Sequence, residues 1–261
     1  MHGIFDSHAH YDDKSFDGDR EETIARIHSA GVCGILNIGC SVESSKKSIA
    51  LAEKFPFIYA AVGLHPDQAD NPPAEWLAEI RKLSYAGKVV AIGEIGLDYH
   101  YDTPARKARA DLFEQQLALA KECSLPVVIH SRDAAEDTLR LLQKYRPQGV
   151  MHCFSGSVET AEEILSLGMY IGFTGVVTFQ NARKAKEVAA MVPMDRLLLE
   201  TDCPYMAPVP FRGKRTTSDM IAYTAEAIGR QKGVSAQEVI DAARNNTQRL
   251  FSIYPDGKAL C

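Results

Sequence analysis

Long apolar runs, paired cysteines and dense basic clusters are all missing from this chain of 261 residues. No apolar run approaches the roughly 18 residues that span a bilayer, and the first residues lack the basic and apolar regions of a signal peptide. We therefore expect a cytoplasmic protein that does not enter membranes. The six cysteines form no Cys-x-x-Cys pair, which favours reduced thiols used in packing.

The balance of charge narrows the classes of partner. A net charge of −5 without any Lys/Arg run argues against a protein that coats duplex nucleic acid. It does not exclude an enzyme that holds only the end of a strand. Nothing in the sequence indicates an obligate protein partner.

Eight apolar segments alternate with segments of helical pattern. They cover residues 4–10, 34–38, 58–62, 89–95, 126–130, 149–152, 169–173 and 196–202. None alternates strictly between apolar and polar residues, which indicates buried parallel strands. Eight such units predict an α/β protein, a single TIM-type (β/α)8 barrel over residues 1–261. The competing fold is a doubly wound open sheet, which usually has fewer units or a glycine-rich phosphate loop; no such loop motif occurs.

Residues that bind metals stand at the ends of these predicted strands. His8 and His10 should point the same way, because side chains alternate along a strand. Glu94 interrupts an apolar strand, and burying its charge costs several kcal/mol unless a cation meets it. The set at the strand ends is His8, His10, His65, Glu94, His130, His152 and Asp202. The carboxyl ends of barrel strands meet at one mouth, so we predict a metal centre there.

The types of ligand indicate the chemistry of this centre. Imidazole and carboxylate without thiolate suit Zn, Mn, Fe or Mg and metal-assisted hydrolysis. The ligands exceed what one tetrahedral ion needs, so the set suits two divalent ions with Glu94 as the bridge. Asp202 could bind a metal and also accept the proton of a metal-activated water, which makes Glu94 and Asp202 the catalytic candidates.

Four residues are candidates for binding substrate. The guanidinium of Arg132 could pair with a phosphate or lie at the surface where a helix begins. Arg212 and Arg215, together with Lys214, could contact a sugar–phosphate backbone or form a solvated cluster. His65 could contact substrate or brace its own loop. The candidates are thus His65, Arg132, Arg212 and Arg215.

Aromatic and sulfur-containing side chains near the strand ends leave two further questions. Four ring-bearing residues, Tyr99, His100, Tyr101 and Phe154, could stack on the bases of a nucleic acid. Alternatively, they could pack the rim of the barrel. Cys153 and Cys203 adjoin His152 and Asp202. Because neighbours in a strand face opposite ways, we expect both thiols to point away from the ligands, which argues against a cysteine nucleophile.

Taken together, these motifs resemble the TatD-type DNase family of metal-dependent hydrolases, among the amidohydrolase-like barrels. Seven segments carry the resemblance in the same order: residues 6–10, 63–66, 93–99, 125–132, 152–156, 199–205 and 212–215. The resemblance implies that one metal ion is held by His8, His10, Glu94 and Asp202, and a second by Glu94, His130 and His152. It also implies divalent-metal-dependent deoxyribonuclease activity, mainly 3′-to-5′ exonucleolytic on single strands.

We therefore expect a divalent-metal-dependent phosphodiester hydrolase. More specifically, we expect a 3′-5′ exodeoxyribonuclease that acts on single-stranded DNA and uses two ions of Mg, Mn or Zn. The alternative is a hydrolase of a small-molecule ester, lactone or amide that uses the same two-metal site. A non-catalytic interaction barrel is disfavoured, since it has no physical reason to keep so many costly polar groups. One departure from the family concerns the basic loop, where Asn-Glu-Pro is replaced by Thr216-Thr217-Ser218.

Overall fold

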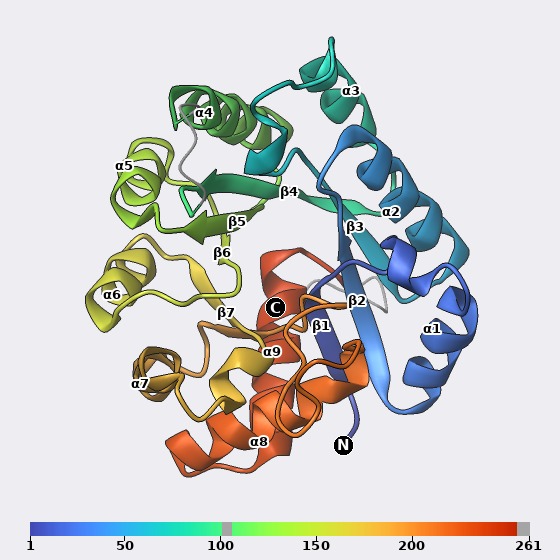
Figure 1. Cartoon of the computed structure of the whole chain (residues 1–261), viewed down its shortest axis with the longest axis vertical. Coiled ribbons are helices and arrows are strands. Elements are labelled where there is room, and N and C mark those ends of the chain that lie inside the picture. The colour runs from blue at the N-terminus through green and yellow to red at the C-terminus, as the bar shows by residue number, and fades with distance from the viewer. Residues whose placement is uncertain (101–105, 255–261) are drawn as a thin grey trace.

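A single sheet of eight strands organises the molecule (Figure 1). The structure is a computed structural model that describes residues 1–100 and 106–254, so Tyr101 lies outside the described residues. The strands are parallel and follow one another in chain order. They are β1 (Ile4–Ala9), β2 (Val32–Ile38), β3 (Ile58–Val62), β4 (Val89–Asp98), β5 (Val127–Arg132), β6 (Gly149–Met151), β7 (Tyr170–Phe173) and β8 (Leu197–Leu199). This topology confirms the predicted barrel of TIM type.

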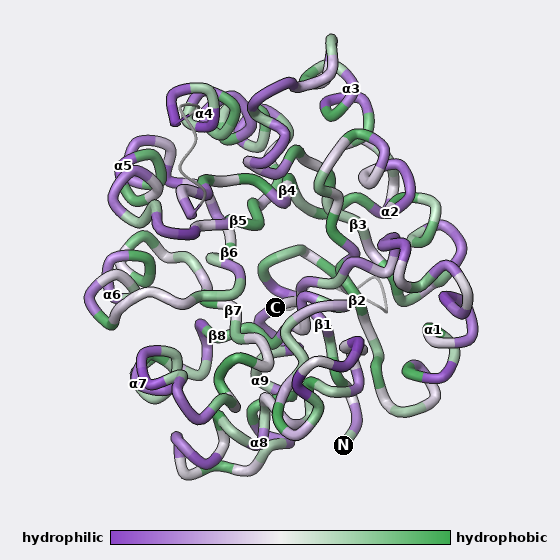
Figure 2. The backbone as a smooth tube through the Cα atoms, viewed as in Figure 1, coloured by the Kyte–Doolittle hydropathy of each residue, from purple (hydrophilic) through white to green (hydrophobic). Residues whose placement is uncertain are grey.

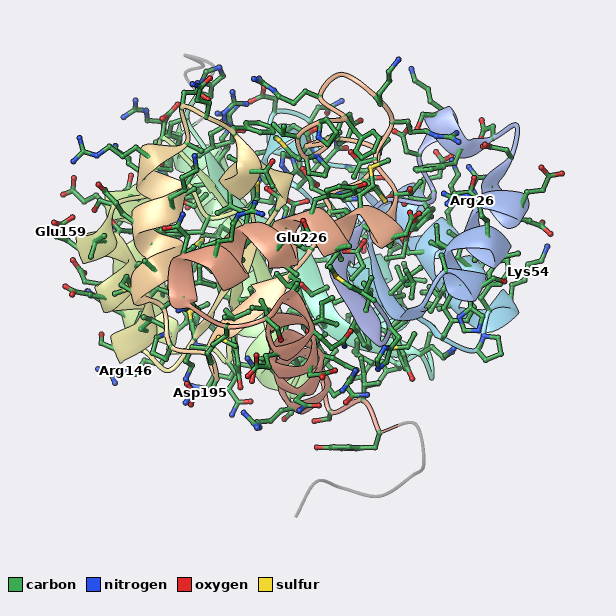
Figure 3. The ribbon with its side chains drawn as sticks, turned by 90° about the horizontal axis from the view of Figure 1, so that it is seen from below. Arg26, Lys54, Arg146, Glu159, Asp195 and Glu226 are labelled. Carbon is green, nitrogen blue, oxygen red and sulfur yellow. The ribbon has the colours of Figure 1, made fainter. Side chains whose placement is uncertain are left out.

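Most of the helices surround the sheet on its outer side, and the last helix is seen in the middle of the ring of strands (Figure 1). The helices are α1 (Arg20–Ser29), α2 (Val42–Lys54), α3 (Trp76–Leu83), α4 (Arg106–Cys123), α5 (Ala135–Tyr145), α6 (Val158–Ser166), α7 (Arg183–Met191), α8 (Ile221–Lys232) and α9 (Ala236–Leu250). Each alternates between hydrophilic and hydrophobic residues (Figure 2), because one face packs on the sheet and the other meets water. Charged side chains such as Arg26, Lys54 and Glu159 project outward at the periphery (Figure 3). In the described part of the chain, no helix is both long and apolar enough to cross a bilayer.

The two faces of the strands pack into separate apolar clusters. Outward side chains such as Ile35, Ile92 and Ile171 join the large cluster between the sheet and its helices. Inward side chains such as Leu36 and Val128 form a smaller cluster with Leu250 at the end of α9 and with Phe251 and Ile253 just beyond it. Each fully buried side chain of this size stabilises the fold by about 1.5–3 kcal/mol. The apolar cluster therefore fills part of the barrel and leaves the carboxyl ends of the strands for polar residues.

The barrel closes between its last and first strands just beyond β8. The expected eighth strand, residues 196–202, is shorter than predicted because the chain leaves the ladder after Leu199. The backbone N–H of Asp202 donates to the carbonyl of His8 at 2.9 Å, and that of His10 donates to Cys203 at 2.9 Å. Ala9 and Cys203 form a parallel bridge. This closure places Asp202 directly beside the His-x-His pair.

Candidate metal centre

The carboxyl ends of the strands surround a cavity of about 570 Å³. This volume is in the range of small-molecule sites, about 300–1,000 Å³. The predicted ligands that line it are His10, Glu94, His130, His152 and Asp202. The sixth, His8, is fully buried and lies against His152, with ring centroids 3.5 Å apart. The structure thus brings all six predicted ligands together.

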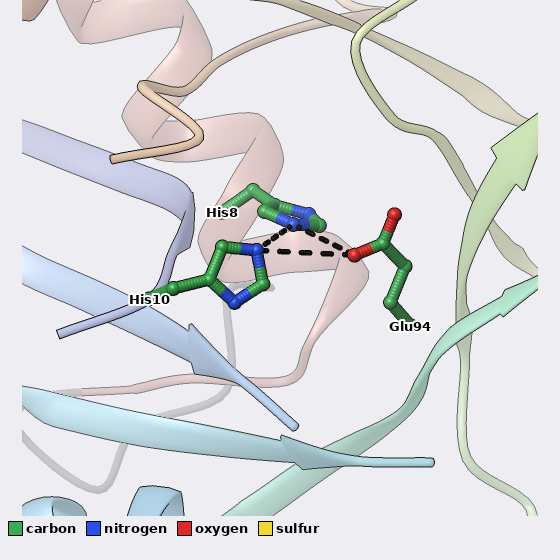
Figure 4. Close-up of side chains that lie close together, drawn as sticks. All are labelled: His8, His10 and Glu94. Carbon is green, nitrogen blue, oxygen red and sulfur yellow. Dashed lines mark hydrogen bonds and ion pairs between the residues drawn. The ribbon is translucent and has the colours of Figure 1, made fainter. Parts of the chain in front are cut away.

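His8 and His10 converge on one oxygen of Glu94 (Figure 4). Their Nε2 atoms are 3.1 Å apart, as expected for residues two apart in extended chain; His8 lies in β1 and His10 directly follows it. Glu94 Oε2 lies 3.4 Å from Nε2 of His8 and 3.8 Å from Nε2 of His10. One carboxylate oxygen and two imidazole nitrogens therefore face a shared point, and the three ligand atoms lie within 4.8 Å of one another.

The other oxygen of Glu94 faces a second pair of histidines. Glu94 Oε1 lies 2.8 Å from Nδ1 of His130 and 3.6 Å from Nε2 of His152. Asp202 Oδ1 lies 3.3 Å from Nε2 of His10 and 4.0 Å from Nε2 of His152, so this carboxylate stands between the two groups. The two oxygens of Glu94 thus serve two separate clusters of ligands.

Electrostatics at the centre keeps the carboxylates charged. Burial raises the pKa of Glu94, but positive charge on His152 and His8 and the hydrogen bond from His130 outweigh it, so the pKa stands well below the ordinary value. Burial also acts on Asp202, yet the hydrogen bond from His10 and the nearby histidine charges lower its pKa. The predicted conflict at Glu94 is therefore resolved by surrounding imidazoles, which makes it an ionised ligand.

Two carboxylates that the sequence analysis did not single out stand behind the histidines. Glu200 Oε1 lies 3.1 Å from Nδ1 of His152, and Asp98 Oδ2 lies 3.2 Å from Nε2 of His130. Glu200 stands one residue past β8 and Asp98 ends β4. Asp98 lies four residues from Glu94 within β4, a period-2 spacing that could have indicated it, whereas Glu200 lies beyond β8, where this alternation does not apply.

These partners change the protonation of the metal-free histidines. Burial disfavours the imidazolium of His130, but its hydrogen bonds to Asp98 and Glu94 outweigh this and raise its pKa to about 10. The same bond lowers the pKa of Asp98, against the effect of burial, to about 2. Burial also opposes charge on His152, while Glu200 and Glu94 raise its pKa.

The arrangement fits divalent metal ions. The ring nitrogen that faces away from the cavity has a partner in three histidines: the carbonyl of Ile38 for His10 at 3.0 Å, Asp98 for His130 and Glu200 for His152. The contacts of His10 and His130 are hydrogen bonds, and a metal-binding histidine characteristically donates its other ring N–H in this way, which sets the tautomer. The contact of His152 with Glu200 is an ion pair without hydrogen-bond geometry. The inward atoms are then Nε2 of His10, Nδ1 of His130 and Nε2 of His152, and this nitrogen and oxygen set suits Zn, Mn or Mg.

The expected direction of Cys153 was wrong. β6 ends at Met151 and Cys153 has a φ of 43°, so the alternation of a strand no longer applies. Its side chain lines the cavity and lies with His152 and Asp202 in a group whose ligand atoms are within 4.8 Å. Burial raises the pKa of this thiol well above the ordinary value, which argues against a thiolate nucleophile. Cys203 is fully buried in the closure of the barrel.

Two of the four predicted substrate-binding residues line the cavity. His65 follows β3. Its Nδ1 accepts from the backbone N–H of Asp67 at 3.3 Å, and its Nε2 lies 3.9 Å from Glu94 Oε1. It therefore braces its loop and also faces the metal centre. Arg132, at the end of β5, is exposed at the wall of the cavity.

The two arginines of the basic loop lie elsewhere. The guanidinium of Arg212 stands 4.2 Å over the ring of Phe179. Arg215 is paired with Asp19 at 2.5 Å and donates to the carbonyl of Ser15 at 2.7 Å. Neither arginine lines the cavity. The segment 216–218, where the chain departs from the family, is buried, and Ser218 Oγ donates to Asp6 at 2.6 Å.

Comparisons with known proteins agree with this geometry. The family model of the TatD related DNases matches residues 5–252. The "uncharacterized metal-dependent hydrolase YabD" of Bacillus subtilis (strain 168) is 44% identical over 253 residues, which cover 96% of this chain and 99% of the relative. The "3'-5' ssDNA/RNA exonuclease TatD" of Rahnella sp. (strain Y9602) is 37% identical over 248 residues, 91% of this chain and 94% of the relative. The crystal structure of YjjV, a TatD homolog from Escherichia coli K12, has a TM-score of 0.91 at 35% identity and covers 97% and 99% of the two chains.

Proposed function

The chain belongs to the family of TatD related DNases and is a metal-dependent hydrolase, and from this premise we propose that it removes nucleotides from the 3′ end of single-stranded DNA. The bond hydrolysed is a phosphodiester, and the site holds two divalent ions. The relative from Rahnella, named a 3'-5' ssDNA/RNA exonuclease, supports the polarity and the single-stranded substrate.

One observation carries the two-metal part of the proposal. Glu94 directs Oε2 toward His8 and His10 and Oε1 toward His130 and His152. A carboxylate that serves a single ion has no need of histidines on both oxygens. We assign His8, His10, Glu94 and Asp202 to one ion, and Glu94, His130 and His152 to the other.

The chemistry divides between the ions and the side chains. When bound, divalent ions act as Lewis acids on the phosphate oxygens and lower the pKa of water toward neutrality. Asp202 accepts the proton of the attacking water, because its carboxylate is ionised and stands between the two groups of histidines. Its surroundings of His8, His10 and His152 hold the carboxylate in place.

Residues at the wall of the cavity would hold the substrate. The guanidinium of Arg132 can bind a phosphate oxygen through two parallel hydrogen bonds. His65 can reach the same phosphate, because its Nε2 faces the cavity near Glu94. Arg212 and Arg215 stand outside this cavity, so a role for them in binding requires a strand that extends beyond it.

We place this activity in the cytoplasm. The five described cysteines are free thiols, the state that cytosolic reductants maintain.

The proposal is tested with a single-stranded oligonucleotide labelled at its 5′ end. Protein stripped with chelator is assayed with Mg, Mn or Zn added separately, beside Glu94→Ala and beside Glu43→Ala as a matched control at an exposed position of α2. We expect a ladder that shortens from the 3′ end, needs metal, and is absent only in Glu94→Ala.

Other outcomes separate the parts of the proposal. A ladder that persists in Glu94→Ala would remove the bridging carboxylate from the mechanism. Metal bound at two equivalents without cleavage by any ion would keep the centre and replace the substrate by a small ester, lactone or amide.

A further inference from the structure

A second hollow of about 420 Å³ adjoins the metal centre. It lies between α5 and α6, and we refer to it as the α5–α6 hollow. Ser131, His152 and Ser155 line both this hollow and the central cavity. The two spaces therefore lie side by side at these three residues. Its volume is within the range of small-molecule sites, about 300–1,000 Å³.

The α5–α6 hollow differs from the central cavity in chemistry. Apart from the shared His152, its described lining contains none of the metal ligands. Its floor is apolar and consists of Met151, Phe154 and Ile164, which are buried, while the half-buried Leu139 forms a side. An apolar floor next to a metal centre suits the uncharged part of a substrate whose charged part is held by the metals.

Hydroxyl groups provide the polar part of the lining. Ser131 Oγ lies 3.1 Å from Thr138 Oγ1, and Ser157 Oγ lies 3.3 Å from Thr160 Oγ1. A hydroxyl can both donate and accept a hydrogen bond. Such groups suit a ring with mixed donors and acceptors on its edge, and they do not favour one pattern over another.

Charge in the lining argues for a neutral occupant. Asp133 contributes a carboxylate, 3.1 Å from Nδ1 of His100, that would repel an anion. Lys184 of α7 is the one cation of the described lining and is exposed. A phosphate inside the hollow would meet the carboxylate, whereas a phosphate beyond the rim could still reach Lys184.

We propose that the α5–α6 hollow binds the base and sugar of the 3′-terminal nucleotide while the scissile phosphate occupies the metal centre. This inference rests on the proposed function and adds the position of the terminal nucleoside. A flat ring with polar edges matches an apolar floor bordered by hydroxyls, and the lining residues common to both spaces place the hollow beside the metal centre. The adaptable hydroxyls predict little preference among the four bases.

The test fills the hollow without touching the ligands. Leu139→Trp narrows it from α5, and Thr160→Trp narrows it from α6. The matched control is Gln143→Trp, one turn further along α5 at an exposed position that lines neither space. Metal content and thermal unfolding of each variant establish that the fold and the centre are intact.

Two substrates are compared on the metal-loaded proteins: a single-stranded oligonucleotide, and methyl 4-nitrophenyl phosphate, a diester without a nucleoside. We expect both filling variants to raise KM for the oligonucleotide by about 10-fold or more, the order that loss of one base contact produces. Hydrolysis of the small diester should stay unchanged, and Gln143→Trp should match the wild type on both. Equal KM values for the oligonucleotide in wild type and filling variants would overturn the inference, as would a parallel loss on both substrates.

A binding measurement keeps this test separate from the test of nuclease activity. If the wild type does not cut DNA, titration of the metal-loaded proteins with thymidine 5′-monophosphate decides the question. Binding that weakens about 10-fold in Leu139→Trp but not in Gln143→Trp supports the nucleoside site. Equal binding in all three proteins overturns it.

Discussion

Glu200 and His152 form a buried pair, with Glu200 Oε1 3.1 Å from Nδ1 of the ring. Glu200 is fully buried, accepts the backbone N–H of Cys153 at 2.5 Å, and approaches Ser7 Oγ at 3.5 Å through its other oxygen. A carboxylate with no exposure needs such partners, because an unpaired buried charge is costly. The pair turns Nε2 of His152 toward Glu94 and so prepares the ring to bind metal.

Replacing Glu200 with Gln should weaken metal binding while the fold is kept. The amide retains the size and one acceptor but loses the charge that supports His152, and loss of such a partner lowers metal affinity by about 10- to 100-fold. Competition with a chromogenic chelator measures the affinity. Glu163→Gln, at an exposed position of α6, is the matched control, and an unchanged affinity in Glu200→Gln would refute the positioning role.

Gly172→Ala should disturb the same pair from the opposite side. A Cβ at Gly172 would lie 2.5 Å from Glu200 Oε2 and 2.7 Å from its carboxyl carbon, closer than atoms can approach. We expect a loss of about 1–3 kcal/mol in the free energy of unfolding, as for other overpacked sites, together with weaker metal binding. Gly87→Ala serves as control because nothing lies within 4 Å of its added Cβ. Urea unfolding that gives equal stabilities for the two variants would contradict the crowding argument.

Metal binding should release protons at pH 7. The pKa of His130 is raised to about 10, so its ring carries a proton before the ion arrives. The pKa of His152 is shifted in the same direction. Ligation requires the neutral ring. Calorimetric titrations in buffers of different ionisation enthalpy count the protons released, and the apparent affinity should increase with pH. An observed enthalpy independent of the buffer would show that the metal-free rings are already neutral.

Asp98→Asn should change how the chelated protein responds to alkaline pH. His130 has a folded pKa of about 10, above the ordinary value near 6.5. Its contribution to stability is therefore fully present below about pH 6.5 and is lost as the pH rises toward 10. Without the Asp98 carboxylate the pKa of His130 should fall, so the variant should lose less stability across this window. Urea unfolding at both ends of the window, with NMR titration of His130, provides the comparison.

Arg132→Ala should impair substrate binding, whereas Arg215→Ala should lower the stability of the fold. Arg132 lines the cavity, so its removal should raise KM for DNA by about 10-fold, as expected when a charge-assisted hydrogen bond to phosphate is lost. Arg215 is paired with Asp19 and Ser15, so its removal should lower the thermal midpoint and leave KM unchanged. Steady-state kinetics and thermal melts on both variants test the assignment. A raised KM in Arg215→Ala would show that Arg215 contributes to substrate binding.

Local sequence determined a large part of this protein. The eight strands and the helices between them follow from apolar patterns within single segments, and a capping box of Ser235 and Glu238 starts α9. His8 and His10 face one point because residues two apart in a strand share a face. The common mouth of parallel barrel strands then placed Glu94, His130, His152 and Asp202 beside them.

Tertiary structure alone decided the features that depend on segments distant in the chain. β8 ends early, and the bridge from Ala9 to Cys203 joins residues almost 200 positions apart. A periodic pattern within one segment cannot predict a contact between residues so distant in the chain. The direction of Cys153 followed from a positive φ beyond the end of β6, and the partner of Arg215 came from the first loop. The role of Glu200 required both Gly172 and His152 to meet it in the interior. A local pattern assigns a residue to a face of its element, but only the packing of elements determines which charges and cavities that face will meet.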